Sequence, residues 1–363
     1  GYTFNQEKSY CKIGDEKQDM TITYDMNTKN LTIAPMTTKG TKCYLYFDEQ
    51  KILLADAIKR DNQINSGTPN FASVATTDEG VFKTQDDWGD SYYFRGAVNN
   101  NWVSFAGYYW RIIRINGDGS IRMIYSGNGS PATTGTGTQI GTNTFSINGS
   151  TYNNNAYVGY MYTVGQVHGL GTNSGIKNTL DSWYQTNIAK KGYGDKVSTE
   201  AGFCGDREPS TNSSTSNGQG GTGTTVTYYG GYIRLVNSTK SPTLKCKNNE
   251  DMYTVSGSSR GNKALTNPVG LITADEVSMA GGVYGQTNQS YYLYTNSAYW
   301  TMSPYYFDVG GSNSWAYVFR VNSSGQLGGY WVSNAYGVRP VINLSTDVTA
   351  KLGNGTSSTP YEI

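Results

Sequence analysis

Alternating hydrophobic and polar positions run through much of this chain and predict β-strands. The first case is residues 20–36, MTITYDMNTKNLTIAPM, where the alternation continues on both sides of Asn27, Thr28 and Lys29. Alternation around turn-forming residues is typical of a β-hairpin. The segment CYLYF, which begins at Cys43, adds a closing strand. Residues 1–48 are therefore predicted to form a small all-β module.

A short helix and a linker are predicted next, in residues 49–76. Leu54 and Ile58 are four residues apart and share a helix face, and Asp48 is the expected N-cap. The segment that follows, NSGTPNFASVATTDEG, is rich in turn-forming residues. It indicates a boundary between two domains.

Strand-like runs return in residues 77–350, which we expect to form one larger domain. YYFRGAV, WVSFAGYYWRIIRI and SIRMIYSG are rich in aromatic and β-branched residues, and NGDG at 116–119 predicts a hairpin turn between the last two. The same kind of run closes the domain, in SYYLYTN, AYWTMSP, WAYVFRVN, YWVSN and GVRPVINL. Residues 351–363 are predicted to be a C-terminal tail.

Two helices are expected inside this domain. In the first, Ser174 is the N-cap, Gly192 ends the helix, and one face carries the apolar side chains of Ile176, Leu180, Trp183, Tyr184 and Ile188. The second begins with a capping box, Thr273 to Glu276. Helices among antiparallel strands and long loops give an α+β fold, preceded by the all-β module.

Composition excludes several classes of function. The net charge of +1 and the 15% of charged residues leave no basic surface for nucleic acid. No apolar run approaches the roughly 18 residues that cross a bilayer. The tracts 127–144 and 210–225 have low complexity and are predicted to be surface loops.

The four cysteines favour disulfides over a metal site. None of them forms a C-x-x-C pair and His168 is the only histidine, so a zinc site is not expected. An even number of cysteines predicts two disulfides in an extracytoplasmic protein, and the alternative is four buried thiols. Among the three possible pairings, Cys11–Cys43 and Cys204–Cys246 are preferred because each then lies within one domain.

The last quarter of the domain, 299–343, has the composition of a recognition surface. Its 45 residues include 11 aromatic ones, and the only charged residues are Asp308, Arg320 and Arg339. Tyrosine and tryptophan among Ser, Asn and Gly are typical of antibody paratopes. The alternative is a core strand with Trp315, Tyr317, Phe319 and Val321 on its inner side. We assign Phe319, Val321, Trp300 and Met302 to the core, and Arg339 to a structural role in which it binds backbone carbonyls.

Six segments within about residues 77–350 are similar to those of a known family: YYFRGAV, YYWRIIRINGDGSIRMIY, FCGDRE, GLITADEV, YWTMSP and YGVRPVINL. They resemble a bacterial surface-protein family with a C-type-lectin-like fold. The GVRP motif is similar to the ending of the formylglycine-generating-enzyme branch, which the variable proteins of diversity-generating retroelements also use. The N-terminal module resembles the membrane-proximal unit of such proteins, which implies an anchor that is not part of this chain.

The resemblance also implies where a ligand binds. In the diversified relatives the variable region is C-terminal, and here it corresponds to about residues 305–334. The contact positions that it implies are Tyr305, Tyr306, Asp308, Asn313, Trp315, Tyr317, Arg320, Tyr330, Trp331 and Asn334. The calcium and sugar motif of true C-type lectins is not matched, because Glu208-Pro209 is not followed by Asn. The reactive cysteine context of the formylglycine enzymes is also missing.

Other polar residues are predicted to be structural. His168 has no catalytic partner in its sequence context, and Asp86, Asp87 and Asp90 are expected in a solvated turn rather than a metal site. Asp206, Arg207 and Glu208 predict a local salt bridge. NGDG lacks the further acids of a calcium loop.

We therefore predict a receptor or adhesin on the bacterial cell surface. It binds a protein or glycan through its aromatic C-terminal face and uses no catalytic residue, cofactor or metal. The alternatives are an enzyme of the same fold, for which no nucleophile, base or metal set is found, and a structural subunit of a surface filament. Free cysteines would favour the enzyme, and concentration-dependent oligomerisation would favour the filament.

Overall fold

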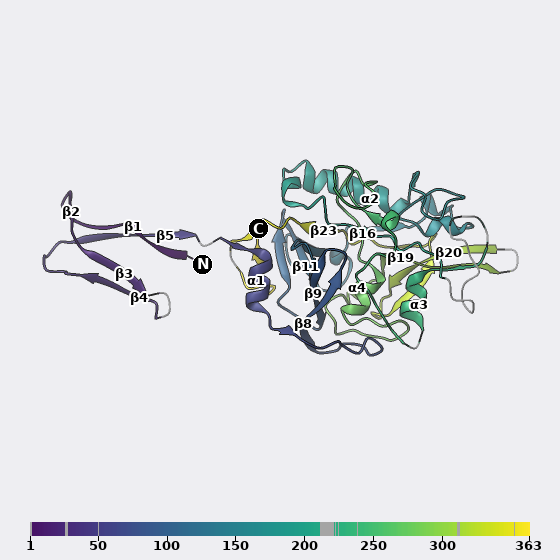
Figure 1. Ribbon diagram of the computed structural model, residues 1–363, viewed down its shortest axis with the longest axis horizontal. Helices are drawn as coiled ribbons and strands as arrows, with labels where there is room; N and C mark the ends of the chain where they lie inside the picture. The colour runs from purple at the N-terminus through teal and green to yellow at the C-terminus, as the bar shows by residue number, and fades with distance from the viewer. Residues whose placement is uncertain are drawn as a thin grey trace.

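The computed structural model describes residues 2–25, 28–49, 51–210, 221, 223, 225–237, 239–310, 313–351 and 353–363. It is a mixed α and β structure, built mostly of sheets with few helices, and most strand pairs are antiparallel. The predicted low-complexity tract 210–225 lies largely outside the described residues, as does Asn27 of the predicted first turn. Figure 1 shows a slender N-terminal module joined to a larger body.

The N-terminal module consists of a three-stranded sheet and a hairpin. The sheet has the order β2-β1-β5 and β3 pairs with β4, as the alternation in residues 20–36 predicted. Phe4, Tyr24 and Phe47 pack together between the two, and the Cys11–Cys43 disulfide joins β1 to β5. The strands are β1 Tyr2–Ile13, β2 Glu16–Gln18, β3 Thr21–Asp25, β4 Asn30–Ala34 and β5 Lys42–Glu49.

The predicted connecting helix is present as α1, Leu54–Asp61, which buries Leu54 and Ile58 as expected. The predicted N-cap at Asp48 is wrong. The helix is entered from β6 (Ile52–Leu53), which pairs with β24 (Thr349–Ala350), and the cap position is Leu53, whose side chain makes no capping bond. Because Ile52 and Leu53 are held in a strand by their pairing with β24, the helix begins only at Leu54, several residues after Asp48.

An eight-stranded sheet has the path β23-β12-β11-β9-β8-β7; β10 also pairs with β11, and β25 pairs with β10. Six of its strands come from residues 64–128, and β23 and β25 come from the C-terminal end of the chain. The predicted hairpin joins β11 to β12 through residues 116–120. Tyr361 of β25 is fully buried beside β10, so part of the predicted C-terminal tail is a docked strand. The bounds are β7 Ile64–Asn65, β8 Asp78–Asp86, β9 Gly89–Gly96, β10 Trp102–Phe105, β11 Tyr108–Ile115, β12 Ile121–Asn128, β23 Val341–Leu344 and β25 Tyr361–Glu362.

The second half of the body forms a six-stranded sheet with the path β13-β22-β19-β20-β21, and β17 pairs with β19 outside this path. Figure 1 shows β19 and β20 extending from the end of the body that lies opposite the N-terminal module. The bounds are β13 Thr142–Thr144, β17 Thr227–Tyr228, β19 Tyr299–Gly310, β20 Asn313–Val321, β21 Leu327–Trp331 and β22 Ala335–Gly337. Two small ladders pair β14 Met161–Tyr162 with β15 Thr172–Asn173 and β16 Phe203–Cys204 with β18 Met252–Tyr253.

Besides α1, the described residues of the body form three α-helices, one more than predicted. α2 (Gly175–Tyr184) is capped by Ser174 and continues as a π-helical turn, Gln185–Ala189, while α4 (Ala274–Met279) has the predicted capping box. The helix that was not predicted is α3 (Gly230–Val236), which begins with two glycines, residues that disfavour helix. Short 3₁₀ turns are Thr136–Thr138, Ile147–Gly149, Asn155–Val158, Gly194–Lys196 and Asn249–Asp251.

One continuous core joins the two sheets, because Trp110 and Ile112 of one sheet and Trp300 and Phe307 of the other belong to the same buried cluster. The residues that we assigned to the core, Phe319, Val321, Trp300 and Met302, are fully buried. Arg339 has the predicted structural role. It is 1% exposed, and its guanidinium donates to the carbonyls of Tyr125 (3.0 Å) and Leu293 (3.4 Å).

Both preferred disulfides, Cys11–Cys43 and Cys204–Cys246, are formed, and no described cysteine is free. They indicate that the chain folds in an oxidising environment. Among the described residues, no helix combines the length and the apolar character that crossing a membrane requires.

Candidate functional site

A β-bulge places two consecutive tyrosines on the same face of the second sheet. In the register of β19 with β20, Pro304 lies opposite Val318 and Tyr306 opposite Tyr317, so Tyr305 is an extra residue. A bulge turns a side chain away from the normal alternation. The rings of Tyr305 and Tyr306 accordingly both lie beside the ring of Tyr317, with centroids 6.4 and 4.4 Å away.

Three tyrosines from three strands form a stack on this face. Tyr228 of β17, Tyr306 of β19 and Tyr317 of β20 are direct neighbours in the sheet register. Their ring centroids are 5.5 and 4.4 Å apart, and successive rings are inclined by only 16° and 11°. Cross-strand aromatic pairs of this kind stabilise a sheet, and they fix the rings in position.

A second stack of three aromatic rings lies next to the tyrosine stack on the same face of the sheet. The ring of Trp315 lies between Tyr152 and Trp331, at 4.5 and 4.9 Å, with inclinations of 18° and 23°. Trp331 is also the register partner of Tyr317, and their rings meet edge to face at 6.3 Å. We call this set of six rings the aromatic ladder: Tyr152, Tyr228, Tyr306, Trp315, Tyr317 and Trp331.

Burial along this face falls from the core towards solvent. Phe319 is fully buried and Tyr305 is 7% exposed, with its hydroxyl 2.8 Å from that of Tyr284. The ladder rings are half-buried, except that Trp331 is 37% exposed. Tyr305 therefore supports the ladder from beneath, while the ladder itself reaches solvent.

The ladder is almost neutral. Burial, followed by the hydrogen bond with Tyr317, raises the pKa of Tyr306, so its hydroxyl stays protonated at physiological pH. Asp308, which lies opposite Trp315, adds one carboxylate to the outer end. Stacked rings that keep their hydroxyls offer apolar contact area together with neutral hydrogen-bonding groups.

Two predicted contact residues, Arg320 and Tyr330, lie on the face of the sheet opposite the aromatic ladder. Tyr330 and Trp331 are consecutive residues of β21, and their side chains therefore point to opposite faces. Tyr330 packs edge to face on Tyr336, and the guanidinium of Arg320 lies over both rings at 4.3 and 4.4 Å. The predicted set is thus divided between two faces.

The remaining predicted contacts lie at the ends of strands. The amide of Asn334 donates to the carbonyl of Trp331 (3.1 Å), which places Asn334 in the turn after β21, next to the ladder. Asn313 pairs with Gly310 in the register, and its side chain lies outside the described residues.

Sequence reasoning missed Tyr152 and Tyr228, which complete the two stacks from outside residues 305–334. Both lie in tyrosine-rich segments, TYNNNAYVGYMY and TYYGGY, and this was the signal available. Composition shows that a segment is rich in tyrosine, but only the pairing of β17 with β19 shows which rings meet.

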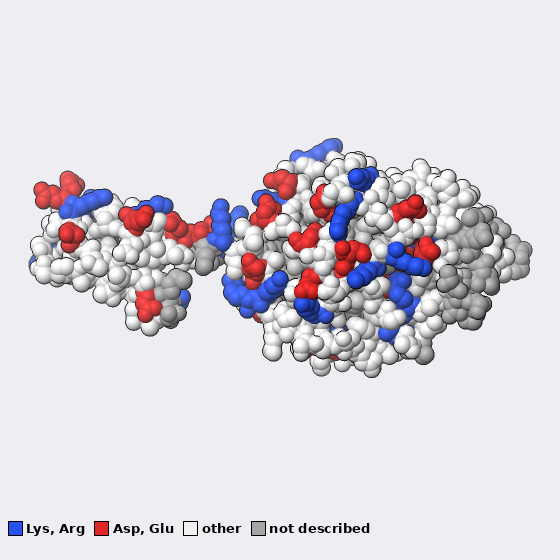
Figure 2. Space-filling model, in the orientation of Figure 1, with Lys and Arg blue, Asp and Glu red and all other residues white. Residues whose placement is uncertain are grey.

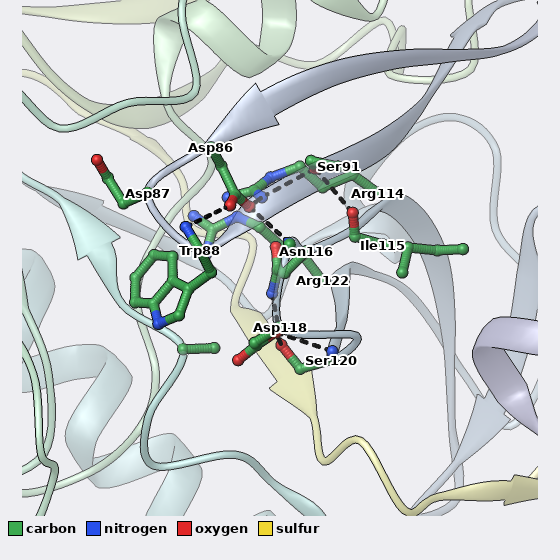
Figure 3. Close-up of polar contacts among 12 residues, drawn as sticks. Asp86, Asp87, Trp88, Ser91, Arg114, Ile115, Asn116, Asp118, Ser120 and Arg122 are labelled. Atoms are coloured by element: carbon green, nitrogen blue, oxygen red, sulfur yellow. Dashed lines mark hydrogen bonds and ion pairs between the residues drawn. The ribbon is translucent and has the colours of Figure 1, made fainter.

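A buried network of charges lies inside the body (Figure 3). Arg114 donates to Asp86 (2.7 Å), which also accepts from the amide of Trp88, as Figure 3 shows. Arg114 donates in addition to Glu276 (3.0 Å), and Asp86 accepts from the amide of Gly117. The predicted solvated turn is therefore wrong for Asp86, which is 3% exposed. Its carboxylate organises the tight turn of β8 to β9 and joins it to the turn of β11 to β12.

Arg122 extends this network from the neighbouring strand. Its Nε lies beside the oxygen of Glu276 that Arg114 also contacts, but without the angle of a hydrogen bond, so their attraction is ionic. Burial opposes ionisation, yet the two arginines hold the pKa of Glu276 below its ordinary value. The adjoining cavity measures about 30 Å³, which is room for a water molecule but not for a substrate.

The predicted local salt bridge among residues 206–208 is wrong, because each residue has a distant partner. Arg207 binds Asp251 (2.9 Å). Asp206 pairs with Arg234, which also binds Asp275 (2.8 Å), and burial raises the pKa of Asp206 to about 6. The contacts of Asp206 and Arg234 fasten residues 203–210 to α3 and α4, and the pair of Arg207 with Asp251 fastens them to the turn Asn249–Asp251.

His168 has partners that its sequence context did not reveal. Nδ1 lies 3.0 Å from a carboxylate oxygen of Asp251, and Nε2 lies 3.3 Å from Glu208 and 3.1 Å from the amide nitrogen of Asn248. The hydrogen bond with Asp251 raises the pKa of His168. The residue thus links the loop around 168 to two other segments.

Within the described residues, no group of three or more His, Cys, Asp or Glu side chains is arranged to hold a metal ion. No protein-family model, curated protein or solved structure matches this chain.

Proposed function

We propose that this protein is a cell-surface receptor or adhesin that binds its ligand through the aromatic ladder. The observation that carries this proposal is the row of six rings in the ladder, of which five are half-buried and Trp331 is 37% exposed. Figure 1 shows that β19 and β20, which carry three of these rings, extend to the end of the body away from the N-terminal module. A face of this kind gives large contact area with little loss of side-chain entropy, because the rings are already fixed by each other.

The surroundings of the ladder support the same proposal. The charged side chains visible in Figure 2 lie mainly over the middle of the body and on the N-terminal module, and both signs are mixed. The described surface near β19 and β20 shows few of them in this view. A ligand at this end is therefore expected to bind through shape, apolar contact and neutral hydrogen bonds rather than through net charge.

The proposal extends to the finer features that the sequence resemblance implies. These are a C-type-lectin-like body, attachment to a bacterial membrane through an anchor outside this chain, and diversification of residues 305–334. Tyr306, Trp315, Tyr317 and Trp331 of the ladder fall in that range, whereas Tyr152 and Tyr228 are expected to be constant. A reverse-transcriptase gene and a near-identical repeat of the coding segment in the neighbouring DNA would test the diversification.

The binding test compares the wild type with Trp331→Ala and Tyr317→Ala on a glycan array and on a panel of intact bacterial and mammalian cells. Both rings are central to the ladder, so each variant is expected to bind the wild-type target about 30-fold more weakly, which corresponds to about 2 kcal/mol for an aromatic hot spot. The melting temperature of the Trp331→Ala variant should change little, because this ring is 37% exposed in the wild type.

A matched control is Tyr193→Ala, since Tyr193 is also 37% exposed but lies elsewhere on the body. It should bind like the wild type. Wild-type protein that binds no member of either panel, or ladder variants that bind as well as Tyr193→Ala, would refute the proposal.

A further inference from the structure

Arg320 differs from the other arginines of the chain. The sequence contains ten, all of them described, and nine donate hydrogen bonds to carboxylates, to a side-chain amide or to backbone carbonyls. Arg320 makes no hydrogen bond or ion pair with a described residue, and its contacts are two aromatic rings. A half-buried guanidinium with five unused donors is unusual, because burying a charge without a partner is costly.

Two rings hold this side chain in place without neutralising it. Its guanidinium lies 4.3 Å from the centre of the Tyr330 ring and 4.4 Å from that of Tyr336, and the two rings stand at 87° to each other. They form a corner in which the cation is favoured by both ring faces. Trp300, the register partner of Arg320, packs edge to face on Tyr336 and supports that wall from the core.

The corner is open on one side. The residue opposite Arg320 on β21 is Gly328, which has no side chain to cover the guanidinium. A Cβ atom built at Gly328 would meet no atom within 4 Å, so the space above this position is free. The guanidinium nitrogens of Arg320 have no hydrogen-bond partner among the described residues, yet they are not fully buried. They therefore remain accessible to solvent.

No carboxylate among the described residues supplies the missing negative charge. Asp308 is the only acidic residue in 299–343, and it lies on the ladder face, opposite Trp315. Burial lowers the pKa of Arg320, and within the part of the chain that the structure describes no carboxylate acts against this effect. The guanidinium nevertheless stays protonated at physiological pH, because an arginine retains its proton in proteins.

We propose that this corner, formed by Arg320, Tyr330, Tyr336 and the open position at Gly328, binds an oxyanion. The planar guanidinium matches the paired oxygens of a carboxylate, sulfate or phosphate group, and partial burial strengthens the attraction relative to water. The site lies on the other face of the sheet from the ladder. It is therefore independent of the proposed function and can exist even if the ladder binds nothing.

The test follows the Nε–H signal of Arg320 by NMR on the ¹⁵N-labelled protein, identified by its loss in Arg320→Lys. Sodium acetate, glucuronate, sulfate and phosphate are titrated separately at constant ionic strength. Saturable shifts with dissociation constants in the millimolar range are expected for at least one anion. The ranking of the four separates a carboxylate site from a sulfate or phosphate site.

Two variants and one control complete the test, each checked for folding by circular dichroism. Anion binding, read from the amide signals of 327–331, should fall at least tenfold in Arg320→Gln and also in Gly328→Thr, which fills the open position without touching the charge. Arg60→Gln, which removes an arginine paired with Asp61, should bind like the wild type. Linear shifts that chloride reproduces, or unchanged binding in Arg320→Gln, would overturn the proposal. Unchanged binding in Gly328→Thr would exclude the open position as the place of the anion.

Discussion

Individual polar residues in this protein are defined by partners far away in sequence. Asp86 was predicted to lie in a solvated turn with Asp87 and Asp90, yet it is buried against Arg114. His168 lies in a glycine-rich segment, and its ring is held between Asp251 and Glu208. The charge of such a residue is set by these partners, so its contribution to stability depends on pH in a predictable direction.

His168 should make stability fall as the pH rises above about 6.5, the ordinary value for histidine. Its pKa is raised in the folded protein by Asp251, so the folded state binds the proton more tightly than the unfolded chain does. The stabilisation is fully present below pH 6.5 and is lost as the pH rises through the raised pKa. The difference in melting temperature between the wild type and His168→Gln should therefore shrink between pH 6 and pH 8.5. A difference that stays constant over this range would show that the ionic contacts of His168 contribute nothing.

At the level of elements, the bulge in β19 decides which aromatic side chains meet. Without the extra residue, Tyr305 and Tyr306 would point to opposite faces, and Tyr306 would not stack on Tyr317. The space that Tyr305 occupies is provided by Gly329 of β21, the register partner of Phe319. A side chain at Gly329 would overlap the ring of Tyr305.

Two adjacent glycines give a matched test of this arrangement. Gly329→Ala is expected to cost about 1–3 kcal/mol of unfolding free energy, because it overpacks the site and displaces Tyr305. Gly328→Ala, one residue earlier in the same strand, meets free space and should be neutral or stabilising by about 0.5–1 kcal/mol. Urea denaturation measures both. Equal stabilities of the two variants would show that Tyr305 is not fixed by Gly329.

At the scale of the whole molecule, the two disulfides act on parts of very different size. Cys204–Cys246 closes a loop within the large body. Cys11–Cys43 joins two strands of a module of fewer than 50 residues, in which Tyr44, Leu45, Tyr46 and Phe47 of β5 are all at least 36% exposed. A module with so little buried apolar surface is stabilised mainly by its cross-link.

Replacing Cys11 and Cys43 with alanine should unfold the module and leave the body intact. The two cysteines are 32 residues apart, and a loop of this length corresponds to about 4 kcal/mol in the chain-entropy model. Hydrogen exchange followed by mass spectrometry should show peptides from 2–49 losing protection while those from α2 and β11 keep theirs. A protected module, or a body that loses protection with it, would contradict this independence.

The sequence by itself determined the local features of this protein. The alternation of 20–36, the capping box at Thr273 and the apolar face of the helix after Ser174 were predicted because neighbouring residues set them. The burial of Trp300, Met302, Phe319 and Val321 was also predicted, because it follows from hydrophobicity. The pairing of the cysteines was predicted for another reason, the division of the chain into two domains that each contain two cysteines.

Only the tertiary structure decided which distant groups meet. The sequence marked residues 299–343 as rich in tyrosine and tryptophan, but a one-residue bulge and the pairing of β17 with β19 assign the rings to a face. Tyr330 and Trp331 belong to one predicted set and yet point to opposite sides of β21. The partners of Asp86, Asp206 and His168 were hidden for the same reason, since charge pairing depends on distances in space that composition and periodicity do not contain.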